Sequence, residues 1–108
     1  MTTATIDTNR YEVSFVNSTA ILYVAYDADN LVLRIGFNSG AVYDYRDMMY
    51  DEYAALIGAE SVGSTFMRVR NTEAYSNYTR LADDVARRFT FDAMRASQGQ
   101  RVFVDSVA

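Results

Sequence analysis

The sequence predicts a single-domain α+β fold, in which an antiparallel β-meander of about four strands precedes two short helices and one long C-terminal helix. Two observations support this prediction. The first half of the chain contains short runs rich in β-branched and aromatic residues, separated by turn residues. In the second half, the spacing of apolar residues changes to three and four, which is typical of helices. A chain of 108 residues has room for one modest core, so we expect one domain over residues 1–108.

The four expected strands follow one another closely, at residues 10–16, 20–27, 31–38 and 41–45. Asp27-Ala28-Asp29-Asn30 and Ser39-Gly40 are suitable hairpin turns between the last three strands. Because side chains alternate along a strand, Tyr43 and Tyr45 are expected on one face of the sheet and Asp44 on the other. Residues 1–9 are polar and expected to be flexible.

Helical spacing predicts a helix over residues 49–57 that ends at Gly58, and a short helix around residues 65–70. A long helix is expected over residues 72–97, ending at Gly99. Its apolar stripe consists of Tyr75, Tyr78, Ala82, Val85 and Phe89. Residues 101–107 are a candidate fifth strand.

The composition excludes several kinds of chemistry. The sequence has no Cys, His or Lys, so it lacks thiolate ligands, an imidazole base and a Schiff-base amine. We therefore expect no catalytic residue, no metal and no cofactor. An enzyme that works with carboxylates remains the alternative, and Asp44, Asp47, Asp51 and Glu52 are its candidate residues. Acidic residues at this position are also favoured by the dipole of the following helix.

The formal net charge is −4, so binding to duplex nucleic acid is not expected. All ten positive charges are arginines, whose planar forks suit phosphate and carboxylate groups. No apolar run is long enough to span a bilayer, and the polar N-terminus does not resemble a signal peptide. We expect a cytoplasmic protein with no membrane partner.

A set of short motifs resembles the KTSC domain family. The matching pieces are Val24-Ala25-Tyr26-Asp27, Leu33-Arg34-Ile35-Gly36-Phe37, Ser39-Gly40-Ala41-Val42-Tyr43-Asp44-Tyr45, and Ser61-Val62-Gly63 followed by Phe66. The usual prolines before the first helix are replaced by Met48 and Met49, and the usual Asn after the Phe is Met67. Residues 82–108 form a C-terminal extension. The resemblance implies the fold but no defined activity.

The order of elements and the small size also resemble phage anti-Thoeris sponge proteins, which are oligomers that sequester cyclic ADP-ribose isomers or cyclic oligonucleotides. This resemblance implies a phage-encoded protein in the host cytoplasm that sequesters a small phosphorylated nucleotide. It concerns architecture alone, so it is an analogy. We also expect a homo-oligomer, because Tyr and Phe are numerous for so small a core and because the strand-like residues 101–107 can pair with an unprotected sheet edge. The alternative is a structural or protein-interaction module, such as a small accessory or virion protein.

The candidate ligand-binding residues lie in two segments. Phe66, Arg68, Arg70 and Asn71 combine an aromatic ring for stacking, arginines for phosphate, and an amide for a base edge or ribose. Arg88 and Arg95 lie on the expected long helix. The alternatives are that Phe66 is a core residue and that the helix arginines pair with acidic residues four positions away. The nine tyrosines either contribute to an interface or fill the core. Asp27–Asn30 is interpreted as a turn and not as half of a calcium loop.

Overall fold

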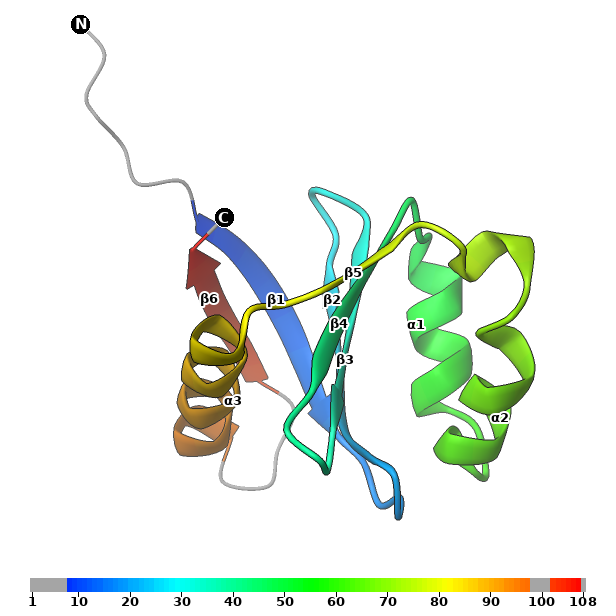
Figure 1. The fold of residues 1–108 in the computed structure, drawn as a ribbon, viewed down its shortest axis with the longest axis horizontal. Helices are drawn as coiled ribbons and strands as arrows, with labels where there is room; N and C mark the ends of the chain where they lie inside the picture. Colours follow the sequence, from blue (N-terminus) through cyan, green and yellow to red (C-terminus); the bar gives the residue numbers. More distant parts are fainter. Residues whose placement is uncertain (1–7, 98–101, 108) are drawn as a thin grey trace, which may run out of the picture.

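The computed structural model describes residues 8–97 and 102–107. Within these residues it forms one six-stranded antiparallel sheet, in the order β5-β4-β3-β2-β1-β6, with helices on both faces (Figure 1). The elements in chain order are β1 (Thr8–Phe15), β2 (Ile21–Asp27), β3 (Val32–Phe37), β4 (Val42–Arg46), α1 (Tyr50–Ile57), α2 (Val62–Val69), the 3-10 helix η1 (Glu73–Tyr75), β5 (Tyr78–Arg80), α3 (Asp83–Ser97) and β6 (Val102–Val107).

The α+β class and the four-stranded meander are confirmed, but the expected number of strands is too low. β6 confirms the candidate strand near the C-terminus, and it pairs with β1 of the same chain. β1 begins at Thr8, so Thr8 and Asn9 belong to the sheet and not to a flexible segment. Residues 1–7 and the expected helix end at Gly99 lie outside the described residues.

The long helix expected from residue 72 is wrong in its first part. The chain instead forms η1 and then β5, and α3 begins only at Asp83. The outer edge of β4 offers unpaired backbone groups, and β5 pairs with them from Tyr78 to Arg80. This pairing outweighs the helical spacing of the local apolar residues. The expected stripe is therefore divided between both faces of the sheet, with Tyr78 and Val85 exposed.

The two faces of the sheet carry separate cores, and helices cover both faces (Figure 1). α1 and α2 cover one face, and the first core lies there: Ile21, Val24, Tyr26, Leu33, Ile35, Tyr45, Met48, Tyr53, Leu56, Val62, Phe66 and Tyr75. α3 covers the opposite face, and the second core contains Tyr11, Val13, Tyr23, Ala25, Val32, Val42, Ala86, Phe89, Ala93 and Val104. Six of the nine tyrosines are buried, so core packing accounts for most of them.

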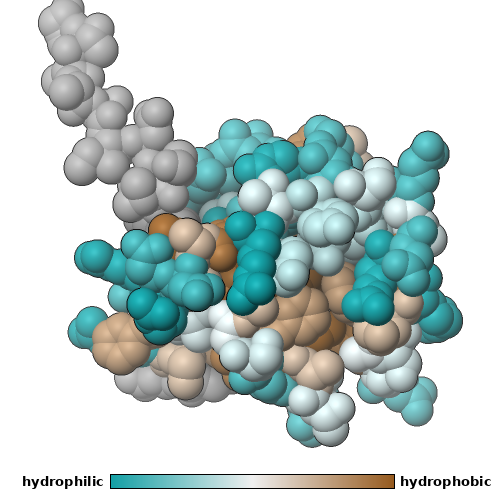
Figure 2. All heavy atoms as spheres, in the orientation of Figure 1, coloured by the Kyte–Doolittle hydropathy of each residue, from teal (hydrophilic) through white to brown (hydrophobic). Residues whose placement is uncertain are grey.

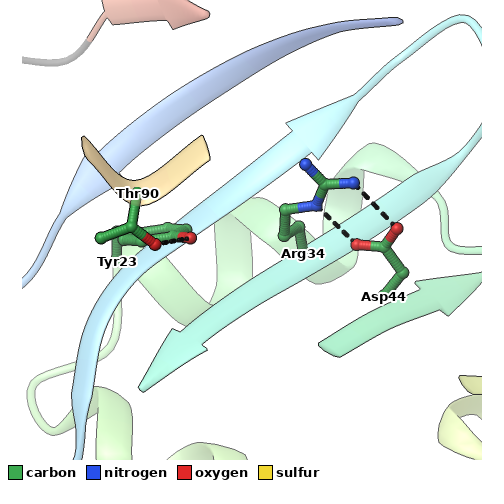
Figure 3. Close-up of polar contacts among 4 residues, drawn as sticks. All are labelled: Tyr23, Arg34, Asp44 and Thr90. Atoms are coloured by element: carbon green, nitrogen blue, oxygen red, sulfur yellow. Dashed lines mark hydrogen bonds and ion pairs between the residues drawn. The ribbon is translucent and has the colours of Figure 1, made fainter. Parts of the chain in front are cut away.

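A buried ion pair lies beneath α3. Arg34 of β3 donates from Nε to Asp44 Oδ1 at 2.7 Å and from Nη2 to Asp44 Oδ2 at 3.0 Å (Figure 3). The guanidinium carbon lies 4.1 Å from the ring centroid of Tyr11 and 4.5 Å from that of Phe89. Burial acts to lower the pKa of Arg34, but the Asp44 carboxylate outweighs it and the pKa is raised. The pair is therefore charged, hydrogen-bonded and covered by aromatic rings.

Tyr23 connects the sheet to α3 beside this pair. Its hydroxyl lies 2.9 Å from Thr90 Oγ1 (Figure 3). Its ring covers Gly36 so closely that a Cβ atom at Gly36 would lie 2.3 Å from ring carbons. The absence of a side chain at position 36 is thus explained by the close approach of an aromatic ring.

We expect Asp44→Ala to lower the free energy of unfolding by about 3–5 kcal/mol, because the buried guanidinium of Arg34 loses the Asp44 carboxylate. Urea unfolding measures the change. Asp83→Asn is the control, because it removes an exposed ion pair with Arg80 and should cost at most about 1 kcal/mol. Equal losses in the two variants would contradict the role of the buried pair.

We also expect a specific loss of stability at alkaline pH. Burial raises the pKa of Tyr23 to about 12, against an ordinary value of 10.0. The folded state favours the neutral phenol, so this stabilisation is present below pH 10 and is lost as the pH rises from 10 to 12. Unfolding midpoints measured across this range should fall less steeply in Tyr23→Phe than in the wild type.

Candidate functional site

A hollow of about 310 Å³ opens between the sheet and the C-terminal end of α2. It is lined by Phe37, Tyr43, Tyr45, Phe66, Arg70, Asn71 and Tyr78, and we call it the aromatic hollow. Figure 2 shows apolar side chains gathered near the centre of the visible face, with hydrophilic side chains around them. The hollow thus combines an aromatic floor with two polar residues.

The strand pairing directs tyrosines into the aromatic hollow. Gly40 has a φ of 102°, and this left-handed conformation lets the chain reverse between β3 and β4. Tyr43 then returns against Phe37, with ring centroids 6.0 Å apart. Tyr45 packs into the first core on the same face, as predicted from the alternation along β4.

Phe66 forms part of the floor of the hollow. Its side chain is 1% exposed, and its ring makes edge contacts with Phe37 and Tyr45 at 5.7 and 5.9 Å. This burial agrees with the alternative that Phe66 is a core residue. Its ring can form a wall of the binding site, but it is too buried to stack on a ligand.

Tyr78 is the aromatic residue most available to a ligand. It is 57% exposed, and its ring lies 6.0 Å from that of Tyr43 and 5.7 Å from that of Tyr45. Tyr78 was not among the predicted ligand-binding residues, because the spacing of apolar residues placed it inside a helix. Its exposure depends on β5, which is paired on one side only.

Arg70 and Asn71 are the polar groups of the hollow, and both are exposed. Arg70 ends α2, where its backbone N–H donates to the Phe66 carbonyl oxygen at 2.9 Å. Burial raises the pKa of Tyr45, a neighbouring tyrosine adds to this, and the positive charge of Arg70 opposes it. Within the described part of the chain, no carboxylate lies within ion-pair distance of Arg70. Its charge is thus available to an anionic ligand.

The structure does not bring the other candidate residues to this hollow. Arg68 projects elsewhere from α2, where Nη2 donates to Thr65 Oγ1 at 3.2 Å. Arg88 and Arg95 lie on α3, on the opposite face of the sheet (Figure 1). The guanidinium of Arg95 instead lies 5.6 Å from the ring centroid of Phe91. The expected pairs between Asp and Arg four positions apart are not formed among the described residues.

The acidic candidates do not form a cluster. Asp44 is bound to Arg34 beneath α3, and the described residues contain no group of three or more acidic side chains placed to hold a metal ion. Asp27 Oδ1 accepts from the backbone N–H groups of Asp29 and Asn30 at 3.0 and 3.2 Å, which confirms the turn.

No described helix is long and apolar enough to cross a membrane.

Comparison with known proteins identifies the family. Residues 17–73, more than half of the chain, match the KTSC domain. The chain belongs to this family. A crystal structure of a KTSC domain protein from Yersinia pestis is also similar, with 25% sequence identity and a TM-score of 0.54. That match covers 69% of this chain and 96% of the Yersinia protein, and no curated protein matches.

The matched residues contain most of the aromatic hollow. Six of its seven lining residues lie within residues 17–73, and Tyr78 lies outside them. β5, α3 and β6 also follow the matched range. The matched residues therefore contain β2, β3 and β4 with α1 and α2 on the first face, while the later elements add both edge strands, β5 and β6, and cover the second face.

We expect two substitutions in the aromatic hollow to differ in how much they lower the free energy of unfolding. Phe66→Ala should cost roughly 3–5 kcal/mol, because it empties a buried site. Tyr78→Ala should cost about 1 kcal/mol or less, because the ring is more than half exposed. Thermal or urea unfolding measures both. A large loss for Tyr78→Ala would mean that its ring is chiefly structural.

Proposed function

We propose that this chain binds a small phosphorylated nucleotide in the aromatic hollow and holds it without altering it. The observation that carries the proposal is the juxtaposition of exposed Tyr78 with Arg70 and Asn71 over an aromatic floor. Stacking of a base on an aromatic ring contributes about 1–3 kcal/mol and tolerates any base. The arginine fork supplies a charge-assisted contact to phosphate, and the amide can donate to and accept from a base edge.

The volume of the hollow limits the ligand. About 310 Å³ is near the lower end of the range of roughly 300–1,000 Å³ that is typical of small-molecule sites. A nucleotide with one base fits this space better than a cyclic oligonucleotide, which would leave further bases in solvent. Nucleotides with a single base, cyclic ADP-ribose isomers among them, are therefore the first ligands to test.

The residues around the hollow favour binding over catalysis. Its lining contains tyrosines, phenylalanines, one arginine and one asparagine, and no carboxylate. The sequence lacks His, Lys and Cys, so the lining offers no base that titrates near neutral pH. The lining thus holds no group suited to catalyse hydrolysis of a bound nucleotide, so we expect the nucleotide to be sequestered unchanged.

A protein-interaction role is the second candidate, and the outer face of α3 favours it. Phe91 and Met94 are 60% and 54% exposed there, beside Arg95. Exposed apolar side chains of this size are common in interfaces. Self-association through α3 would leave the aromatic hollow open on the opposite face of the sheet.

We expect calorimetry to show saturable binding of a phosphorylated nucleotide, with the unchanged ligand recovered after heat denaturation. Neutral adenosine should bind far more weakly, and affinity should fall as salt rises, because charge-assisted contacts supply much of the recognition. Arg70→Ala should lower the affinity about tenfold or more. Arg68→Ala is the matched control, because Arg68 lies on the same helix but does not line the hollow. Equal losses in both variants, or no heat from any phosphorylated ligand, would count against the proposal.

We expect Phe91→Ser combined with Met94→Ser to shift light-scattering mass towards the monomer without changing nucleotide affinity. A wild-type protein that is monomeric at tens of micromolar would contradict self-association through α3.

A further inference from the structure

We propose that Arg80 is a second phosphate-binding arginine at the rim of the aromatic hollow, and that the preferred ligand carries a diphosphate. This inference rests on the proposed function and concerns the chemical class of the ligand. It assigns a role to β5, a strand that the spacing of apolar residues did not predict.

The register of β5 places Arg80 on the same face as the hollow. Tyr43 is paired with Arg80, and Tyr45 with Tyr78. Directly opposite residues of an antiparallel pair project to the same face of a sheet. The 5.7 Å separation of the Tyr45 and Tyr78 rings shows this for the second pair. Arg80 therefore projects beside Tyr43, one of the lining residues.

The residue after β5 supports this placement. Leu81 packs against the second core, beneath α3. Because successive side chains of an extended chain alternate, its neighbour Arg80 projects to the opposite face, where the aromatic hollow lies. Arg80 is not itself a lining residue, but it is paired with the lining residue Tyr43. Arg70 comes from the end of α2 and Arg80 from the sheet edge, so a ligand held between them would contact two different elements.

The present partner of Arg80 is easily exchanged. Arg80 Nη2 lies 3.6 Å from Asp83 Oδ1, and the two side chains are 56% and 77% exposed. An exposed pair with one long contact contributes about 0–1 kcal/mol, and salt screens it. The buried pair of Arg34 and Asp44 has two contacts of 2.7 and 3.0 Å. Arg80 can therefore leave Asp83 for a phosphate at little cost.

Two arginine forks favour a ligand with two phosphate groups. Each guanidinium can bind one phosphate through two parallel N–H donors. A monophosphate can engage only one fork fully, and the second then remains with Asp83. The net charge of −4 repels anionic ligands at long range. A second arginine at the site offsets this repulsion and therefore raises the affinity for a diphosphate.

Calorimetry with ADP, AMP and adenosine tests this inference on the intact chain. The wild type should bind ADP about tenfold or more tightly than AMP, because a second charge-assisted contact forms. Arg80→Ala should remove most of this difference while AMP affinity changes little. Asp83→Asn should tighten ADP binding, because it frees Arg80 and removes a negative charge. Arg87→Ala on α3 is the matched control and should change neither affinity.

The outcomes separate this inference from the proposed function. If AMP binds and depends on Arg70, but Arg80→Ala leaves the preference for ADP unchanged, the inference is wrong and the proposed function stands. If no nucleotide binds to the wild type, both are wrong. Should Arg80→Ala disturb the edge strand, Arg80→Lys gives the same test, because it keeps the charge and removes the bidentate fork. An unchanged preference for ADP in both Arg80→Lys and Asp83→Asn would also overturn the inference.

Discussion

Arg34 and Asp44 form a buried ion pair that links the two central strands β3 and β4 beneath α3. Two charges under a helix are tolerated only because each satisfies the other and because Tyr11 and Phe89 cover the guanidinium. The four residues come from β3, β4, β1 and α3. A single interaction therefore sets the pairing of the central strands and also the place where α3 closes over the sheet.

The same pair determines where the candidate site lies. Asp44 is held towards α3, so its neighbours Tyr43 and Tyr45 must project to the opposite face. The motif Tyr43-Asp44-Tyr45 thus serves two sides of the sheet at once, with its carboxylate in one layer and its rings in the other. Substitutions at Asp44 would disturb the aromatic hollow without any contact with it.

The sequence was informative where local chemistry decides the structure. The hairpin turns, the alternation along β4 and the helix of Phe66 all follow from neighbouring residues, so three of the six candidate site residues lie together. β5 was missed because its three exposed residues are ordered by the open edge of β4 and not by their own pattern. The face to which Arg88 and Arg95 belong depends on the packing of α3, which spacing alone does not reveal. Counting outwards from a two-residue turn at Ser39 and Gly40 places Arg34 opposite Tyr45, whereas the register of the sheet pairs Arg34 with Asp44. The buried ion pair was therefore not predictable from the expected turn.

The division of the sheet between two cores has a consequence for synthesis on the ribosome. The face beneath α1 and α2 can close once the chain has emerged as far as Tyr75, because its core residues all precede that point. The other face, which holds the charged pair, stays uncovered until α3 has been synthesised. One edge of β1 stays unpaired until β6 has been synthesised. A nascent chain paused between these two stages would present a half-covered sheet with an open strand edge, the form most exposed to chaperones and to association with its neighbours.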